Sequence, residues 1–154
     1  MKNMLPILIL FLTLGNANLY AQQNQPGSGK PQQASAAAVR RFVGYWMGID
    51  PLDGGDSRRS ISRNADGTFS MIGRDTVFTL CDNTDRAVIT VSDGVVVNSA
   101  LTSDNLIITC FNTGATVPLK VRYEIVDTNI IREITTQQGG TPVDEIIFHR
   151  VSER

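Results

Sequence analysis

The chain has 154 residues, 42% of them hydrophobic and 19% charged, which is the length and composition of one ordinary globular domain. Its net charge of −1, with Arg58-Arg59 as an isolated basic pair, excludes the strongly basic surface that nucleic-acid binding requires. The sequence contains no phosphate-binding loop, nucleophile elbow or zinc-ligand spacing, so it nominates no catalytic residue, metal ligand or cofactor, and we do not expect an enzyme.

Residues 1–21 have the three-part layout of a secretory signal peptide. Lys2 gives the positive start, an uncharged apolar run covers residues 5–14, and a more polar stretch ends at Ala21, after which we expect cleavage. Cleavage after Ala17 is the alternative. The apolar run is too short to cross a bilayer core of about 30 Å as a helix. We therefore predict a secreted or periplasmic protein without a permanent membrane anchor.

Residues 22–38 are rich in Gln, Pro, Gly and Ser and lack large apolar side chains. Such a segment cannot bury enough surface to offset the entropy of ordering, so we predict a disordered linker. The alanines within residues 34–42 favour one or two helical turns that lead into a domain covering residues 39–154.

From Val43 onward, short apolar or alternating runs are separated by turn residues, and no run has a sustained helical period. We expect eight to ten antiparallel strands at about 43–49, 58–63, 67–72, 75–81, 86–92, 94–101, 105–111, 117–126, 128–136 and 142–151. The turns between them are expected at Asp66-Gly67, Asp93-Gly94, Asp104-Asn105, Asp127-Thr128-Asn129 and Gly139-Gly140. Successive hairpins form an up-and-down meander, and closure into a barrel would remove its two edges. We predict this all-β barrel, with a two-sheet sandwich as the alternative.

The chain has two cysteines, Cys81 and Cys110, and both lie in the expected mature domain. An even number of cysteines in an exported protein favours a disulfide, which we predict here. A redox pair is disfavoured because the two residues lack the close spacing of a Cys-x-x-Cys motif.

Gly44-Tyr45-Trp46, at the start of the first expected strand, and Arg150 in the last one resemble the lipocalins and the wider calycin group of barrels. The resemblance implies a barrel over residues 39–151, with Trp46 across its closed end and Arg150 packed over the tryptophan ring. An arginine on an indole face gains about 0.5 to 2 kcal/mol. The opening of the domain also resembles avidin-type barrels, but a single tryptophan does not supply the several that line their biotin site.

The candidate ligand site centres on Arg132, which shares one strand face with Ile130 and Ile134. If that face is the barrel interior, Arg132 would bind the anionic group of a fatty acid, a use of interior arginine that the barrel resemblance implies, with Tyr123, Phe69 and Met71 as lining. The alternative is an outward Arg132 that pairs with an acid such as Glu124.

Two other features of the sequence contain residue types that occur in functional sites. His149, the only histidine, lies on the last expected strand and is interpreted as half-buried and structural rather than catalytic. The loop of residues 50–56 carries three aspartates, but its spacing is not that of a calcium loop, and we assign it no metal.

Two function classes follow from these observations. The first is an exported lipocalin-like protein that holds a small hydrophobic or amphipathic molecule, as the resemblance implies. The second is a non-enzymatic structural or protein-interaction domain of the cell envelope or the secreted proteins. Bulky side chains filling the interior would favour the second class, and a cavity would favour the first.

Overall fold

The structure is a computed structural model that describes residues 36–76, 81 and 86–152. The predicted signal peptide and the linker up to residue 35 lie outside the described residues. A helix, α1 (Ala36–Phe42), takes in the last three residues assigned to the linker and agrees with the helical turns expected before the domain.

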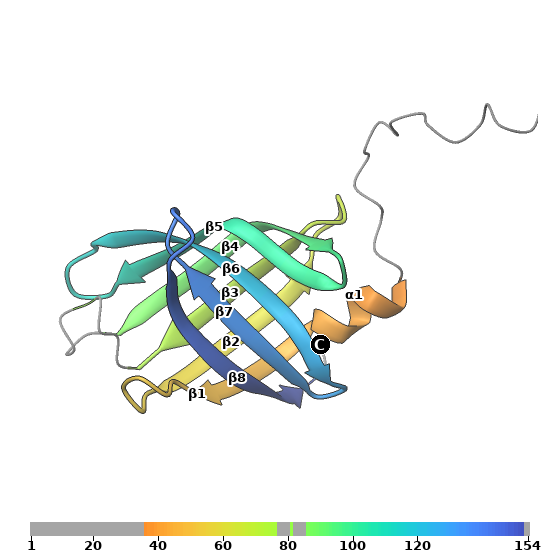
Figure 1. Cartoon of the computed structure of the whole chain (residues 1–154), viewed down its shortest axis with the longest axis horizontal. Coiled ribbons are helices and arrows are strands. Elements are labelled where there is room, and N and C mark those ends of the chain that lie inside the picture. Colours follow the sequence, from red (N-terminus) through yellow and green to blue (C-terminus); the bar gives the residue numbers. More distant parts are fainter. Residues whose placement is uncertain (1–35, 77–80, 82–85, 153–154) are drawn as a thin grey trace, which may run out of the picture. The chain divides into compact units, whose positions relative to one another are not determined.

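Eight antiparallel strands follow α1 within the described residues. They are β1 (Gly44–Ile49), β2 (Asp56–Arg63), β3 (Phe69–Asp75), β4 (Ala87–Val97), β5 (Ala100–Cys110), β6 (Thr116–Asp127), β7 (Ile130–Thr136) and β8 (Pro142–Ser152). Each strand pairs with the next, and β8 pairs with β1, so the meander closes into a barrel (Figure 1). The predicted all-β, up-and-down barrel is confirmed.

The expected strands at 86–92, 94–101 and 105–111 are arranged differently, because they form only β4 and β5. The turn between these strands lies at Asn98-Ser99, whose φ angles of 49° and 65° are those of a two-residue hairpin turn. The expected turns at 93–94 and 104–105 were wrong, since both lie inside strands beside register irregularities. The Asp93 carboxylate accepts hydrogen bonds there from the Ser103 hydroxyl and the Asn105 amide of the neighbouring strand.

Most of the expected strand at 75–81 lies outside the described residues. Asp75 ends β3 and Thr76 lies in a bend, while residues 77–80 are outside the described part of the chain.

The barrel has two different ends, set by its connections. The helix end holds α1, the start of β1, the end of β8 and the short hairpins after β2, β4 and β6 (Figure 1). The loop end holds the connections after β1, β3, β5 and β7. Between them, inward side chains from every strand form one apolar core, which includes Trp46, Ile61, Phe69, Met71, Ile89, Leu106, Leu119, Ile131 and Phe148.

Trp46 and Arg150 close the helix end. Trp46 is fully buried, and its indole nitrogen donates to the Phe42 carbonyl of α1 at 2.9 Å. The Arg150 guanidinium lies 4.1 Å from the centre of the tryptophan ring. Gly44 begins β1 with a φ of 148°, a conformation that favours glycine. The arrangement implied for Gly44, Trp46 and Arg150 is present.

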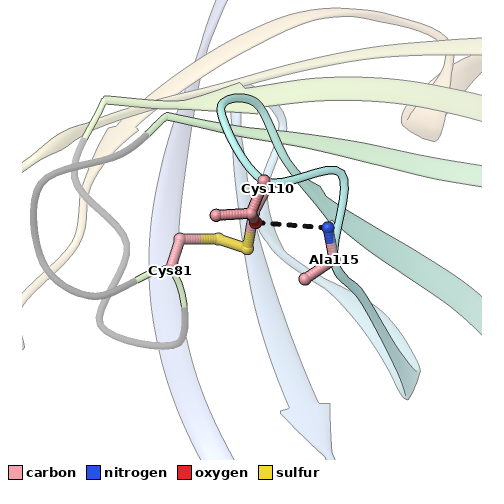
Figure 2. The surroundings of a disulfide bond; sticks show 4 residues. Cys81, Cys110 and Ala115 are labelled. Atoms are coloured by element: carbon pink, nitrogen blue, oxygen red, sulfur yellow. Dashed lines mark hydrogen bonds between the residues drawn. A yellow bond between two sulfur atoms is a disulfide. The ribbon is translucent and has the colours of Figure 1, made fainter.

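A disulfide between Cys81 and Cys110 belongs to the loop end, as predicted (Figure 2). It ties the connection between β3 and β4 to the last residue of β5, with the two Cα atoms 5.5 Å apart. Both cysteines are buried and form part of the apolar core. No helix in the described part of the chain is long and apolar enough to cross a bilayer.

Candidate functional site

The barrel interior contains a buried ionic network centred on Arg59, whose side chain is 1% exposed. The guanidinium donates from Nε and Nη2 to the two carboxylate oxygens of Glu133, at 2.7 and 2.8 Å. Its Nη1 donates to Asp75 Oδ1 at 2.6 Å. The Tyr123 hydroxyl donates to Glu133, and the Phe148 ring lies 4.9 Å from the guanidinium carbon. One cation therefore meets two carboxylates, a phenol and an aromatic face.

Strand register positions these groups. Arg59 lies directly opposite Gly73 on β3, and Tyr123 lies opposite Glu133 on β7. A Cβ atom at Gly73 would come within 2.8 Å of the Arg59 Cδ atom and 2.9 Å of a main-chain oxygen. The missing side chain of Gly73 thus provides the space in which the long Arg59 side chain enters the interior.

Burial and charge shift the pKa values of this network. Burial alone would lower the pKa of Arg59, but the charges of Glu133 and Asp75 outweigh it and keep that pKa well above the ordinary value. Burial raises the pKa of Asp75, although Arg59 acts in the opposite direction. Burial, followed by the charge of Glu133, raises the pKa of Tyr123 well above its ordinary value. Tyr123 consequently stays neutral and acts as a hydrogen-bond donor to Glu133.

Asp144 lies between this network and the loop end of the barrel. Burial, and then the charges of Asp50, Glu133 and Asp75, raise the pKa of Asp144 to about 6. Its Oδ1 atom accepts a hydrogen bond from the main-chain N–H of Glu145 at 2.6 Å. Among the described residues, the carboxylates of Asp50, Asp75, Glu133 and Asp144 thus share this part of the barrel with the cation of Arg59.

The interior space that these groups line is small. It measures about 20 Å³ and is bordered by Arg59, Asp75, Glu133, Thr135 and Asp144 together with apolar side chains. That volume accommodates about one water molecule, whereas sites for small organic ligands measure about 300 to 1,000 Å³. Among the described residues, no three side chains of the metal-binding types are grouped so as to hold a metal ion.

The four residues of the predicted ligand site do not come together. Phe69, Met71 and Tyr123 point into the interior and are fully buried, as expected of lining residues. Arg132 does not, because β7 turns Ile131, Glu133 and Thr135 inward.

The predicted interior position of Arg132 was therefore wrong, and the alternative outward pairing is present. Its side chain is 39% exposed and forms ion pairs with Glu124 on β6 and Glu145 on β8. The buried ionic network of Arg59, Asp75 and Glu133 was not singled out as a site from the sequence. One feature of the sequence could have pointed to this network. Gly73 has no side chain, and it lies in the strand that follows the one with Arg58-Arg59.

His149 is exposed on the outer face of β8 and not half-buried as interpreted. The aspartates of the first loop order its backbone, since Asp50 Oδ1 accepts from Leu52 N at 2.7 Å and Asp53 Oδ1 accepts from Gly55 N at 2.8 Å.

Two hollows on the outer face of the barrel are lined by described residues, one over β1 to β4 and one over β8, β1 and the start of β2. The first, which we call the arginine groove, measures about 360 Å³ and is lined on the outside by Tyr45, Arg58, Ser60, Ile72, Arg74 and Val88. The second, the β1–β8 groove, measures about 320 Å³ and is lined by Met47, Gly48, Ile49, Asp56, Ile147 and His149. Both are much larger than the interior space beside Arg59.

Comparison with protein-family models and with curated proteins gives no match for this chain.

Proposed function

We propose that this chain is an exported, non-enzymatic protein-interaction module whose outer face over β8, β1, β2 and β3 contacts a partner protein. The observation that carries the proposal is the difference in space between the two sides of the barrel wall. Among the described residues, the interior space beside Arg59 measures about 20 Å³, whereas the two outer grooves measure about 360 and 320 Å³.

Exposed apolar side chains on the same outer face support this proposal. Ile72 is 64% exposed, Ile49 57%, Val151 56% and Ile147 41%. Large apolar side chains gathered on one face of an exported domain are typical of a surface that another protein covers. The disulfide and the closed barrel would keep this face rigid, which lowers the entropy cost of binding.

In this proposal the chain is a calycin-type barrel that uses its interior for packing. The closed meander and the Trp46–Arg150 contact support the relationship to that group. A hydrophobic ligand inside the barrel would have to displace Arg59 or its acids, and either displacement leaves a buried charge without a partner. The carrier function is for this reason the weaker of the two.

Site-directed photocrosslinking tests the proposal. We expect p-benzoylphenylalanine at Ile72 or at Ile147 to crosslink to a discrete partner protein in cells that export the mature chain. The matched control is the same substitution at Arg122, an exposed residue on β6 at a different part of the barrel wall. Equal crosslinking from Ile72, Ile147 and Arg122, or none from any of them, would contradict a specific binding face.

A titration with a fluorescent fatty acid provides the second arm. We expect no saturable binding to the wild-type protein. Saturable one-to-one binding that is lost when Met71 is replaced by Trp would locate a ligand in the interior and overturn the assignment of a filled core.

A further inference from the structure

Two arginines face each other across neighbouring strands in the arginine groove. Arg58 on β2 and Arg74 on β3 are direct cross-strand partners, and both point outward. Like charges in this position are destabilising, so the pair costs the fold stability unless an anion lies between them.

Nearby acids neutralise this pair only weakly. The Asp56 carboxylate is 4.0 Å from Arg58, and about half of each side chain is exposed. No acidic group in the described part of the chain lies within ion-pair distance of Arg74. The groove therefore presents an excess of positive charge.

Apolar surface adjoins these two guanidinium groups. Ile72, two residues before Arg74 on β3, lies opposite Ser60 on the outer face, and Ser60 lies opposite Tyr45 on β1. Val88 lies opposite Arg74 on the other side. The same groove thus combines a cationic pair with the exposed Ile72 and the half-buried Val88 and Tyr45.

We propose that the arginine groove binds an acidic, extended segment of the partner protein, with carboxylates on Arg58 and Arg74 and an apolar side chain on Ile72. This inference rests on the proposed function and adds the chemistry of the partner. The guanidinium group offers a planar pair of donors that matches a carboxylate. Alternating acidic and apolar residues of an extended segment would place both groups within reach of the groove.

The form of the groove favours a protein segment over a small free anion. Sites for small molecules enclose about 70 to 90% of the ligand, which a groove on an outward barrel wall does not do. The closed barrel has no strand edge, so a segment cannot add as a further strand and must be recognised by side chains. The chain's own residues 22–35 contain Lys30 and no acid, so they lack the complementary charge.

The test uses the mature chain, residues 22–154, and a labelled ten-residue peptide of alternating Glu and Val. Fluorescence anisotropy is measured for the wild type, for Arg58→Gln with Arg74→Gln, and for a control with Arg40→Gln and Arg63→Gln. The control arginines are exposed and lie outside the groove, and both double variants change the net charge equally. We expect at least tenfold weaker binding for the groove variant, less than twofold change for the control, and weaker binding at high salt.

Equal weakening in both double variants, or equal binding of a peptide with Gln in place of Glu, would overturn the inference. Binding of inorganic phosphate or of phosphatidylglycerol vesicles, but not of the peptide, with loss in the groove variant would reassign the site to another anion. Self-association that is lost in the groove variant would reassign it to a second copy of this chain. A thermal melt confirms folding, and we expect the groove variant to melt no lower than the control because a like-charge contact is removed.

Crosslinking from Ile147 separates this inference from the proposed function. If the peptide does not bind but Ile147 still crosslinks to a partner protein, the acidic-segment inference fails and the interaction function stands. If neither occurs, both fail.

Discussion

Two arginines of the barrel each lie on an aromatic ring, but their surroundings differ. At the helix end, Arg150 lies 4.1 Å from the centre of the Trp46 ring and donates to the main-chain carbonyls of Val43 and Arg41, both at 2.6 Å. In the interior, Arg59 lies over Phe148 and is matched by two carboxylates. Arg150 remains partly exposed, whereas Arg59 is 1% exposed. A fully buried cation such as Arg59 requires countercharge, whereas water still solvates part of Arg150.

The largest expected effect is on the free energy of unfolding, and it differs between substitutions of these two arginines. Arg59→Met leaves Asp75 and Glu133 buried without their cation, and we expect it to lower the free energy of unfolding by about 3 to 5 kcal/mol. The interactions that Arg150→Met removes include a cation–π contact and two hydrogen bonds at a partly exposed position, and we expect a loss of about 1 to 3 kcal/mol. Urea unfolding followed by far-UV circular dichroism measures both.

A further variant tests the role of the buried charges even if Arg59→Met does not fold. Arg59→Met combined with Asp75→Asn and Glu133→Gln removes the unpaired charges, so we expect it to regain part of the lost stability. Equal losses for Arg59→Met and Arg150→Met, with no recovery in the triple variant, would show that the carboxylates do not set the difference.

The two ends of the barrel are also held by different means. The helix end depends on packing and hydrogen bonds of α1, whereas the loop end contains the Cys81–Cys110 crosslink. A closed loop of this length, with a sequence separation of 29 residues, contributes about 3 to 4 kcal/mol in the chain-entropy model. We expect this loss for the double substitution of both cysteines by Ala, measured by urea unfolding. Wild-type protein in reductant should match the double variant, and an unchanged midpoint in reductant would contradict the assignment.

The Trp46–Arg150 contact and the Cys81–Cys110 disulfide could be predicted because few other residues could form them. Two cysteines offer only one pairing, and the expected export favoured its oxidation. The resemblance to calycin barrels implied the contact of Trp46 with Arg150, whose strands, the first and the last, are brought together by closure. Meander closure follows from successive hairpins and the cost of exposed edges.

The interior charges could not be predicted because the residue alternation of β7 did not determine which face of the strand points inward. In Ile130–Thr136 each of the two faces carries isoleucine and one charged residue, Arg132 on one and Glu133 on the other. Contacts with other strands determine which face of β7 points inward. Arg59 on β2 enters the interior opposite Gly73, and its guanidinium requires the Glu133 carboxylate there. The hairpin at Asn98-Ser99 was missed for a similar reason, since the nearby Asp93-Gly94 is the stronger local turn signal.

The smallest expected effect concerns Asp144, and it tests whether the loop end carries excess negative charge. The pKa of Asp144 is raised to about 6 in the folded protein, against about 3.9 in an unfolded chain. A carboxyl whose folded pKa is raised favours folding only in its protonated form. Stability is therefore lost as the pH rises from about 4 to about 6, and the penalty is complete above about pH 6.

Asp144→Asn mimics the neutral form and keeps the oxygen that accepts from Glu145 N. Because Asp144 is only partly buried, solvent screening reduces the effect, and we expect Asn to stabilise the protein by about 1 kcal/mol at pH 7 and hardly at all at pH 4. Urea unfolding at pH 4, 5, 6 and 7 measures this, with Asp104→Asn as control because the Asp104 side chain is 79% exposed. A gain for Asp144→Asn that does not change with pH, or one equal to that of Asp104→Asn, would mean that Asp144 ionises freely and that the interior acids do not repel it.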